Sequence, residues 1–367
     1  MPFLRVLSKA AVRILAVLCC AATAPAQNTT QEKVIGGPYA VNVTQTSATV
    51  AWVVESGKAS LGLAPGNLDR TAPVLHTEKV SYAGLQPGKT YYYDVLNGRP
   101  EGKGSFRTAP KSDVPFEFVV YGDTRTRDDV HRKVIATMLT HSAPEFALQT
   151  GDLVENGLDS AQWPIYFDIE REWLRKVSFF PMVGNHERNA RQFFGFFDAK
   201  PYYAFDWGGS HFMVIDSDIA TASNISDSSA AFWAEETRWL EEQLKASQSA
   251  GMRFVVAHHG PISAVSGRAP EAHMTALMPL LEKYKVTAGF FGHDHNYQHY
   301  LRNGVHYVIS GGGGAPLYDV NSPPPGITQK VAMIENFLVI KASGKRAHVE
   351  AMDINGNAID SFDLRAQ

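Results

Sequence analysis

The sequence predicts an all-β N-terminal sandwich over residues 34–110 and an α/β layered domain over residues 114–367. Two observations predict this division. Before about residue 110, apolar residues alternate in short runs separated by turn residues, which is typical of a β-sandwich. After that point, apolar strands alternate with segments of helical length, which is typical of α/β layers. With 367 residues and 44% apolar content, the chain is long enough to bury a core in both regions.

The first 26 residues have the pattern of a secretory signal. Three basic residues precede an apolar run over residues 14–20, and Ala24-Pro25-Ala26 offers small residues for cleavage before Gln27. The apolar run is shorter than the roughly 20 residues that a membrane helix needs. No later run is apolar enough to span a bilayer. We therefore expect a signal peptide over residues 1–26, a secreted or periplasmic protein, and no integral membrane segment.

Composition narrows the chemistry and the partners. Both cysteines, Cys19 and Cys20, lie in the signal, so any metal bound by the mature chain must use His, Asp, Glu or Asn. The chain has 34 basic and 37 acidic side chains and no basic block. Binding to long nucleic acid is therefore disfavoured, whereas a small phosphorylated substrate needs only a local site. The composition does not indicate an oligomeric state.

Residues 34–110 contain several short candidate strands. One carries Trp52, two more are expected on either side of a Pro87-Gly88 turn, and G-K-G-S-F-R-T-A-P provides an exit strand. The early tryptophan, the L-x-P-G-x-T-Y-Y-Y block over residues 85–93 and the closing F-R-T-A-P over residues 106–110 resemble a fibronectin type III domain. This resemblance implies a small sandwich of antiparallel strands.

From Pro115 onward, strands such as F-E-F-V-V-Y and F-A-L-Q alternate with helices. Helical patterns cover residues 128–141, 159–177, 230–246 and 270–284. A hairpin is expected around Gly208-Gly209. The tail is expected to end in β-hairpins that turn at Ser343-Gly344 and Asn355-Gly356, because these dipeptides favour tight turns.

Five apolar strands of this region end in polar motifs. The motifs are G-D-T-R (122–125), G-D-L-V-E (151–155), G-N-H-E (184–187), H-H-G-P (258–261) and G-H-D-H (292–295). Strand ends are where α/β folds place their chemistry, so the five motifs are expected to converge on one edge of the sheet. A glycine ahead of the polar residue permits a sharp turn there. Carboxylate, amide and imidazole groups suit hard or borderline metal ions. Six or more such ligands exceed the need of one four-coordinate ion, which favours two ions that share a bridging carboxylate.

The five motifs, in this order, resemble the calcineurin-like metallophosphoesterase superfamily. Together with the fibronectin-like region they resemble its purple acid phosphatase branch. The resemblance implies a first metal ion bound by Asp123 and His295, a second bound by Asn185, His258 and His293, and Asp152 as the bridge. It also implies that His186 protonates the leaving group or holds a phosphate oxygen, as a histidine that titrates near neutral pH can.

The implied activity is hydrolysis of phosphate monoesters by a metal-bound hydroxide. A phosphodiesterase of the same superfamily is a close alternative, and a non-catalytic protein that binds a surface partner is a further one. The third residue of the D-x-H motif is Arg125 here, which cannot bind a metal and which we expect to bind phosphate. Glu155 stands where the purple enzymes have a tyrosine. It could replace that ligand without giving colour, so the metals stay open between iron, manganese and zinc.

Some residues have two interpretations from the sequence. His258 is favoured over His259 as the metal ligand by the family pattern. Glu187 orients His186 or forms a salt bridge. The remaining expectations are a surface-helix position for His131, a rim position in contact with substrate as one possibility for Tyr297 and His299, and a tight turn near the active-site edge for Gly311 to Gly314.

Overall fold

A computed structural model describes residues 32–96, 98–112 and 114–367. The predicted signal peptide over residues 1–26 lies outside the described residues and stays a prediction. No helix of the described ranges is long and apolar enough to cross a membrane.

The first of two large sheets has nine strands in the order β18-β17-β16-β6-β7-β8-β1-β2-β3. Its strands are β1 (Lys33–Val41), β2 (Ser47–Leu61), β3 (Arg70–Ala83), β6 (Phe116–Tyr121), β7 (Phe146–Gln149), β8 (Ser178–Pro181), β16 (Asn336–Ser343), β17 (Arg346–Asp353) and β18 (Ala358–Arg365). β6, β7 and β8 are parallel, and β16 runs antiparallel to β6. The three parallel strands are short, almost wholly buried apolar runs, as strands covered on both faces require.

The second large sheet has seven strands in the order β15-β13-β14-β12-β11-β10-β9. Its strands are β9 (Tyr203–Trp207), β10 (Ser210–Val214), β11 (Arg253–Val256), β12 (Ala288–Phe291), β13 (Tyr297–Arg302), β14 (Val305–Ser310) and β15 (Thr328–Ala332). β10, β11 and β12 are parallel, and β12 is also parallel to β14. A separate two-stranded sheet pairs β4 (Thr90–Asp94) with β5 (Lys103–Arg107).

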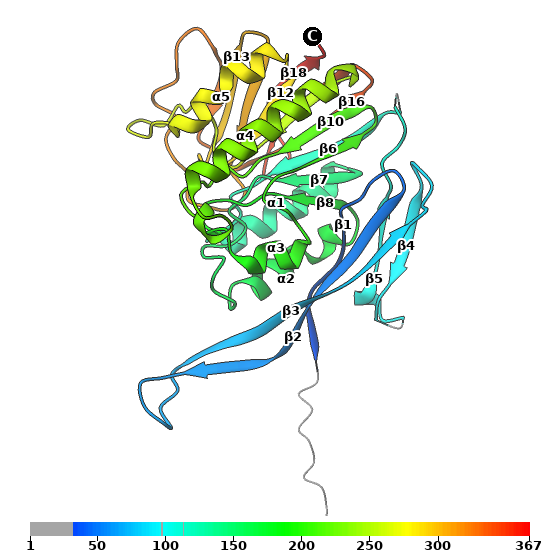
Figure 1. Ribbon diagram of the computed structural model, residues 1–367, viewed down its shortest axis with the longest axis vertical. Helices are drawn as coiled ribbons and strands as arrows, with labels where there is room; N and C mark the ends of the chain where they lie inside the picture. The colour runs from blue at the N-terminus through cyan, green and yellow to red at the C-terminus, as the bar shows by residue number, and fades with distance from the viewer. Residues whose placement is uncertain (1–31, 97, 113) are drawn as a thin grey trace, which may run out of the picture. The chain divides into compact units, whose positions relative to one another are not determined.

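Helices cover the outer face of each large sheet (Figure 1). They are α1 (Asp128–His141), α2 (Trp163–Leu174), α3 (Arg191–Phe197), α4 (Ser229–Ala246) and α5 (Ala272–Lys283), with short 3₁₀ turns η1 (Pro100–Gly102), η2 (Ala222–Asn224) and η3 (Ser247–Ser249). One buried cluster joins α1, α2 and α3 to the first sheet, and another joins α4 and α5 to the second. The result is a mixed α/β sandwich with helices outside and two sheets inside.

Phenylalanines from both sheets fill the space between them. Phe118 and Phe146 of the first sheet lie with their ring centroids 5.4 Å from that of Phe212 in the second sheet. Phe254 and Phe290 continue this cluster, and all five side chains are fully buried. Burial of each ring stabilises the fold by about 1.5–3 kcal/mol relative to exposure. This core fixes the two sheets against each other and thereby sets the spacing of the loops that follow their strands.

The α/β part of the prediction is confirmed in its main elements. α1 has the predicted bounds, and α2, α4 and α5 lie within or close to the predicted ranges. The predicted hairpins are β9–β10, β16–β17 and β17–β18. Helix α3 was not predicted, because its seven residues, R-Q-F-F-G-F-F, are too few and too uniformly aromatic to show a helical period.

The N-terminal strands join the first large sheet, because β1 pairs in parallel with β8 through Ala40 and Ser178. Strands lie on either side of Pro87-Gly88 as predicted, and of these β3 pairs with β2 and β4 pairs with β5. Tyr91 of β4 stacks on Phe106 of β5 at 5.8 Å, and this aromatic contact ties the tyrosine block to the exit strand. The fibronectin-like sandwich stays a prediction.

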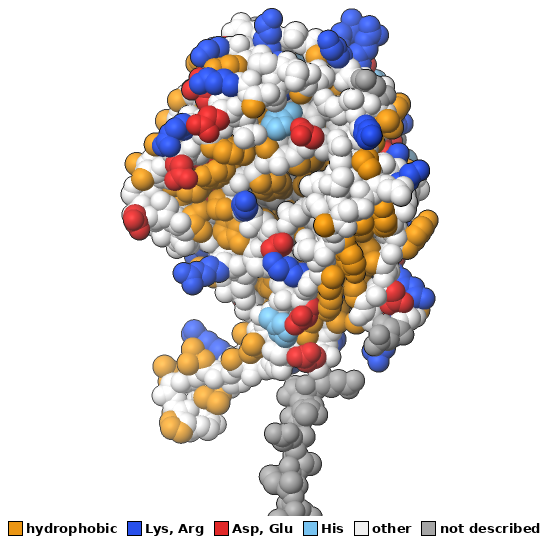
Figure 2. Space-filling model, turned by 45° about the vertical axis from the view of Figure 1, so that its right-hand side comes forward, with side chains coloured by type: hydrophobic (Ala, Val, Ile, Leu, Met, Phe, Trp, Pro, Cys, Tyr) orange, Lys and Arg blue, Asp and Glu red, His pale blue; other side chains and the backbone are white. Residues whose placement is uncertain are grey.

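The β2–β3 hairpin extends past the strands of its sheet as an arm with an apolar tip. Leu61, Leu63 and Leu68 are exposed at this tip, with Leu63 fully accessible. Figure 2 shows the hydrophobic side chains gathered at the end of the arm. Elsewhere on the drawn face, basic and acidic side chains are interspersed, as expected for a chain without a basic block.

Candidate metal centre

The five polar motifs lie at the carboxyl ends of parallel strands, but these strands belong to two sheets. Asp123, Asp152 and Asn185 follow β6, β7 and β8 of the first sheet. His258 and His293 follow β11 and β12 of the second. The expectation of a single sheet edge was wrong, because nothing in the strand patterns tells which sheet a strand joins. Stacking of the sheets brings both sets of loops together.

The glycines of the motifs make room for the carboxylates. A Cβ on Gly184 would lie 2.3 Å from Asp152 Oδ1, and a Cβ on Gly292 would lie 2.5 Å from Asp123 Oδ2. The aspartates also adopt a left-handed backbone, with φ of +56° at Asp123 and +55° at Asp152. Non-glycine residues seldom adopt this conformation, and such strain is found most often at functional sites.

The first group of candidate ligands is Asp123, Asp152 and His295, all buried. One ligand atom from each lies within 4.8 Å of the others. The Asp123 carboxylate accepts the backbone N–H of His293 at 3.0 and 3.1 Å and lies 3.5 Å from His295 Nε2. His295 donates from Nδ1 to the carbonyl of Pro316 at 2.7 Å, which leaves Nε2 as the lone-pair nitrogen facing the carboxylates.

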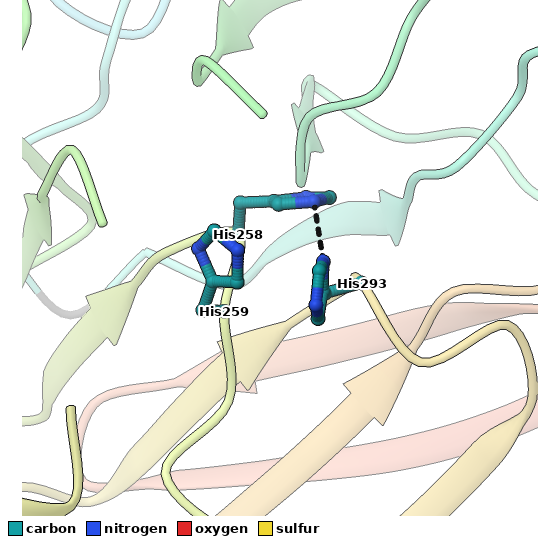
Figure 3. A group of neighbouring side chains, drawn as sticks. All are labelled: His258, His259 and His293. Atoms are coloured by element: carbon teal, nitrogen blue, oxygen red, sulfur yellow. Dashed lines mark hydrogen bonds between the residues drawn. The ribbon is translucent and has the colours of Figure 1, made fainter. Parts of the chain in front are cut away.

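The second group centres on the amide oxygen of Asn185. This oxygen lies 3.0 Å from His258 Nε2 and 2.9 Å from His293 Nδ1. Figure 3 shows the His258 and His293 rings pointing toward each other, and their facing nitrogens are 3.2 Å apart. His258 Nδ1 donates to the carbonyl of Thr150 at 2.7 Å, so its Nε2 is directed into the group. Asp152 Oδ1 lies 3.3 Å from the same Nε2 and links the two groups.

His259 lies beside this second group, with its ring centroid 4.1 Å from that of His293. Its Nδ1 is 3.0 Å from the hydroxyl of Ser217. A nitrogen of His259 also falls within 4.8 Å of nitrogens of His258 and His293. Both histidines considered as the metal ligand, His258 and His259, therefore lie close to His293. In the described structure, His258 is the one that contacts Asn185 and Asp152.

Burial sets the protonation of these side chains. It lowers the pKa of His258 and His293, and lowers that of His295 to about 4. Burial and then the charge of Asp152 raise the pKa of Asp123 well above its usual range. Burial also acts on Asp152, but its surroundings, led by the His258 ring and including the His186 backbone N–H and Arg125, hold its pKa below the usual value. Neutral imidazoles beside two buried carboxyl groups are the ligands that a metal cation needs, so these residues fit metal ions.

Glu187 organises the loop that carries Asp152. Its buried carboxylate accepts backbone N–H groups from Asp152, Leu153 and Gly184 at 2.8 Å and from Val154 at 3.2 Å. Burial, and then the charge of Asp152, raise its pKa to about 8. Both roles expected from the sequence were wrong, because the carboxylate is saturated by backbone donors rather than paired with His186 or a cation.

Arg125 lies against the first group. Its Nε donates to Asp152 Oδ2 at 3.2 Å, its Nη2 is 3.4 Å from His295 Nε2, and its side chain is 11% exposed. Glu155, the possible metal ligand of the sequence analysis, is 51% exposed and forms an ion pair with Arg125 Nη1. Thr126 donates to the same carboxylate at 2.9 Å. The structure therefore does not bring Glu155 into either group.

A pocket of about 490 Å³ opens over the centre. Its lining includes Arg125, His186 and two residues that the sequence analysis missed, Arg268 and Tyr318. Arg268 Nε lies 2.9 Å from Asp294 Oδ1, its Nη2 contacts His293 Nε2, and its guanidinium lies 4.9 Å from the ring centroid of Tyr318. A lone arginine in the S-G-R-A-P loop after the fourth motif was the available signal.

Comparison with known proteins agrees with this architecture. Residues 116–297 match the family described as calcineurin-like phosphoesterase. Residues 116–297 form a calcineurin-like phosphoesterase domain. The superfamily predicted from the five motifs is thereby confirmed, and the domain is of a type that acts on phosphate esters.

The relatives of this phosphoesterase domain include acid phosphatases. The chain is 27% identical to purple acid phosphatase 15 of Arabidopsis thaliana over 68% of its length and 55% of the relative. It is also 27% identical to tartrate-resistant acid phosphatase type 5 of Sus scrofa, over 60% of its length and 75% of the relative. The chain thus spans about half the length of the plant relative. A purple acid phosphatase from yellow lupin (Lupinus luteus) seeds has the same fold, with a TM-score of 0.69, 17% identity, and coverage of 89% of this chain and 74% of that one.

Three further side chains named in the sequence analysis lie away from the pocket. His131 is buried in α1 and pairs with Glu170 at 2.8 Å, so its predicted surface position was wrong. Tyr297 and His299 are buried in β13, and both contact Asp360 at 2.9 Å. A rim position for these two is therefore not what the structure shows. The glycine turn packs on the first motif, with Gly311 against Asp123.

Proposed function

We propose that the protein is a secreted phosphatase that hydrolyses phosphate monoesters with two metal ions. The phosphoesterase domain and the acid phosphatases among its relatives support the reaction class. The observation that carries the two-ion proposal is the position of Asp152. Its carboxylate groups with Asp123 and His295 and lies 3.3 Å from His258 Nε2 of the other group. A buried carboxylate between two sets of candidate ligands would suit a bridging role, which supports the proposal of two ions.

The proposed ligands divide into two sets that share Asp152. The first set is Asp123, Asp152 and His295, and the second is Asp152, Asn185, His258 and His293. Mixed oxygen and nitrogen ligands suit iron, manganese or zinc, so the metal pair stays open among these. Glu155 is left out of both sets because its carboxylate is engaged by Arg125 and Thr126.

Bound ions at this centre supply a nucleophilic water of lowered pKa and neutralise charge on the phosphate. The protein positions the substrate from the pocket wall. Arg125 and Arg268 present guanidinium groups suited to phosphate oxygens. His186 Nδ1 donates to the carbonyl of Glu155 at 2.7 Å, so Nε2 is the nitrogen free to exchange a proton. We assign His186 to protonation of the leaving oxygen from Nε2.

The two arginines support a monoester over a diester. A phosphate monoester carries up to two negative charges on its terminal oxygens, whereas a diester carries one. Arg125 and Arg268 both line the pocket, and each can pair with one charged oxygen. A phosphodiesterase would need the pocket to accept a second ester group, so the ratio of the two activities tests this part of the proposal.

Export rests on the N-terminal pattern of residues 1–26. The proposed substrate is a small phosphorylated molecule that reaches the pocket outside the cytoplasm. Mass spectrometry of the mature N-terminus after expression in a secreting host checks this point, and a chain that still begins at Met1 in the cell interior contradicts it.

The proposed function is tested by hydrolysis of a chromogenic phosphomonoester and its matching diester. The protein is assayed after chelation and again after addition of manganese, zinc or iron, beside the variant Asp152→Ala as control. We expect turnover that the chelator removes and a metal restores, faster with the monoester, and absent in the variant. Equal turnover by Asp152→Ala contradicts the two-ion centre. No turnover with either ester and any metal favours a non-catalytic binding protein, and faster diester turnover favours a phosphodiesterase.

A further inference from the structure

The two metal positions of the proposed centre differ in their ligands. The second position has four candidate side chains, namely Asp152, Asn185, His258 and His293, with facing atoms at about hydrogen-bond distance. Among the described residues, the first position has three, Asp123, Asp152 and His295. The loop that follows Asp123 contributes Arg125 to this position, and arginine cannot bind a metal ion.

The Arg125 guanidinium lies on the acceptor atoms that a metal at the first position would use. Its Nε is 3.2 Å from Asp152 Oδ2, and its Nη2 is 3.4 Å from His295 Nε2, the lone-pair nitrogen of that ring. The side chain is 11% exposed. Glu155 forms an ion pair with Nη1. The guanidinium is therefore held in place by these contacts. It occupies Asp152 Oδ2 and His295 Nε2, so only part of the ligand set of the first position is available to a metal ion.

The charges at the first position also set Arg125 in competition with a metal ion. The carboxylates of Asp123 and Asp152 are both buried, and a cation beside them compensates their repulsion. Arg125 supplies one permanent positive charge, because its guanidinium does not lose its proton in proteins. A metal ion at the first position has to displace this charge from Asp152 and His295, or share the space with it at a cost in repulsion.

The second position has no such competitor on its ligand atoms among the described contacts. Arg268 approaches His293, but its Nη2 contacts Nε2, whereas the atom that faces Asn185 is Nδ1. His258 Nε2 and Asn185 Oδ1 contact only members of the group and Asp152.

We propose that Arg125 acts as a resident cation at the first metal position, so that the protein binds one metal ion tightly at the second position and another weakly at the first. The inference rests on the proposed function, since it divides the same centre into a strong and a weak half. When an ion does enter the first position, Arg125 leaves Asp152 and His295 and stays on the pocket wall, where it meets the phosphate.

Metal binding measured without substrate tests this inference. The purified protein is freed of metal and dialysed against increasing manganese or zinc, and the bound metal per chain is measured by mass spectrometry. We expect two steps whose dissociation constants differ by at least tenfold. Arg125→Gln and Arg125→Met both remove the charge, and we expect each to tighten the weak step at least tenfold. Asn185→Ala is the matched control and is expected to weaken the tight step.

The outcomes separate the two proposals. Two equally tight steps in the unsubstituted protein overturn the unequal centre, as does a weak step that both Arg125 variants leave unchanged or weaken further. Neither result contradicts the proposed function if metal-dependent hydrolysis persists. A protein that binds no metal, or hydrolyses no ester, contradicts the proposed function itself. The melting temperature of each variant shows that it is folded. If one of the two Arg125 variants does not fold, the other still tests the proposal.

Discussion

The Glu187 carboxylate accepts a hydrogen bond from the backbone N–H of Asp152 at 2.8 Å. It thereby holds in place the residue that links the two groups of candidate metal ligands. Each oxygen of this carboxylate accepts two backbone N–H groups: Oε2 from Asp152 and Gly184, and Oε1 from Leu153 and Val154. Loops that follow β7 and β8 are thereby held together by one side chain. The left-handed backbone at Asp152 is kept in place by this arrangement rather than by the intrinsic preference of aspartate.

Glu187→Gln is therefore expected to damage both stability and activity. A glutamine amide presents two N–H donors where two backbone N–H groups already point, so at least one buried donor loses its acceptor. An unsatisfied buried polar group costs about 1–3 kcal/mol, and we expect the free energy of unfolding to fall by about 3 kcal/mol in urea titrations. Hydrolysis is expected to fall at least tenfold, because Asp152 loses its support. A variant with unchanged stability would show that the four donors find other partners.

The buried pair of His131 and Glu170 predicts a second stability effect. Glu170 Oε1 lies 2.8 Å from His131 Nε2, and its Oε2 accepts the hydroxyl of Tyr121 at 3.0 Å. Glu170→Ala leaves both partners buried without an acceptor, and we expect a loss of about 3–5 kcal/mol in the free energy of unfolding. Glu170→Gln keeps an oxygen and an amide at the same place, so it is expected to lose less than half as much. Equal losses for the two variants would assign the effect to the charge of the carboxylate, since glutamine keeps the side-chain volume that alanine removes.

The sequence predicted the residues of the centre better than their surroundings. Strand ends followed by Asp, Asn or His indicated the members of both groups. Stacking of the two sheets, which the sequence does not show, brings them together. The role of Glu187 was predicted wrongly because its carboxylate accepts backbone N–H groups of a loop 33 to 35 residues earlier in the chain, and the sequence carries no signal for such contacts. His131 was misread for a similar reason: its partner Glu170 lies on another helix, so the period of α1 alone gives no indication of the pair.

Arg268 was missed because a single arginine in a loop carries no spacing signal, and its role can be tested. In the proposed phosphatase it pairs with the second charge of a monoester. Arg268→Ala is expected to raise KM for a phosphomonoester about tenfold or more and to change KM for the matching diester by less than threefold, since a charge-assisted hydrogen bond contributes about 1.5–3 kcal/mol. Arg268→Lys, which keeps the charge, should recover part of the loss. Parallel changes in KM for both esters would place Arg268 in a structural role through Asp294 instead.

The buried carboxyl group of Asp216 predicts how stability depends on pH. Asp216 follows β10 and accepts the N–H of Asp218 at 2.9 Å, and its own N–H donates to Glu236 at 2.6 Å. Burial raises the pKa of Asp216 to about 8, against an ordinary value of 3.8. Because the folded pKa is raised, the folded chain holds a proton that the unfolded chain releases. The associated stability is complete below about pH 4 and is lost as pH rises toward 8.

Asp216→Asn replaces the carboxyl group by an amide that does not titrate, and it keeps an oxygen that can accept the N–H of Asp218. Compared with the unsubstituted protein, the variant is expected to gain little at pH 4.5 and to be more stable by a few kcal/mol at pH 8, since one pKa unit corresponds to about 1.4 kcal/mol. Urea unfolding at pH 4.5, 6 and 8 measures the difference directly. Glu236 is also buried and its pKa is raised, first by burial and then by Asp216, so the double variant with Glu236→Gln should flatten the pH dependence further. A gain in the single variant that is the same at all three pH values would show that the effect comes from hydrogen bonding and not from titration of Asp216.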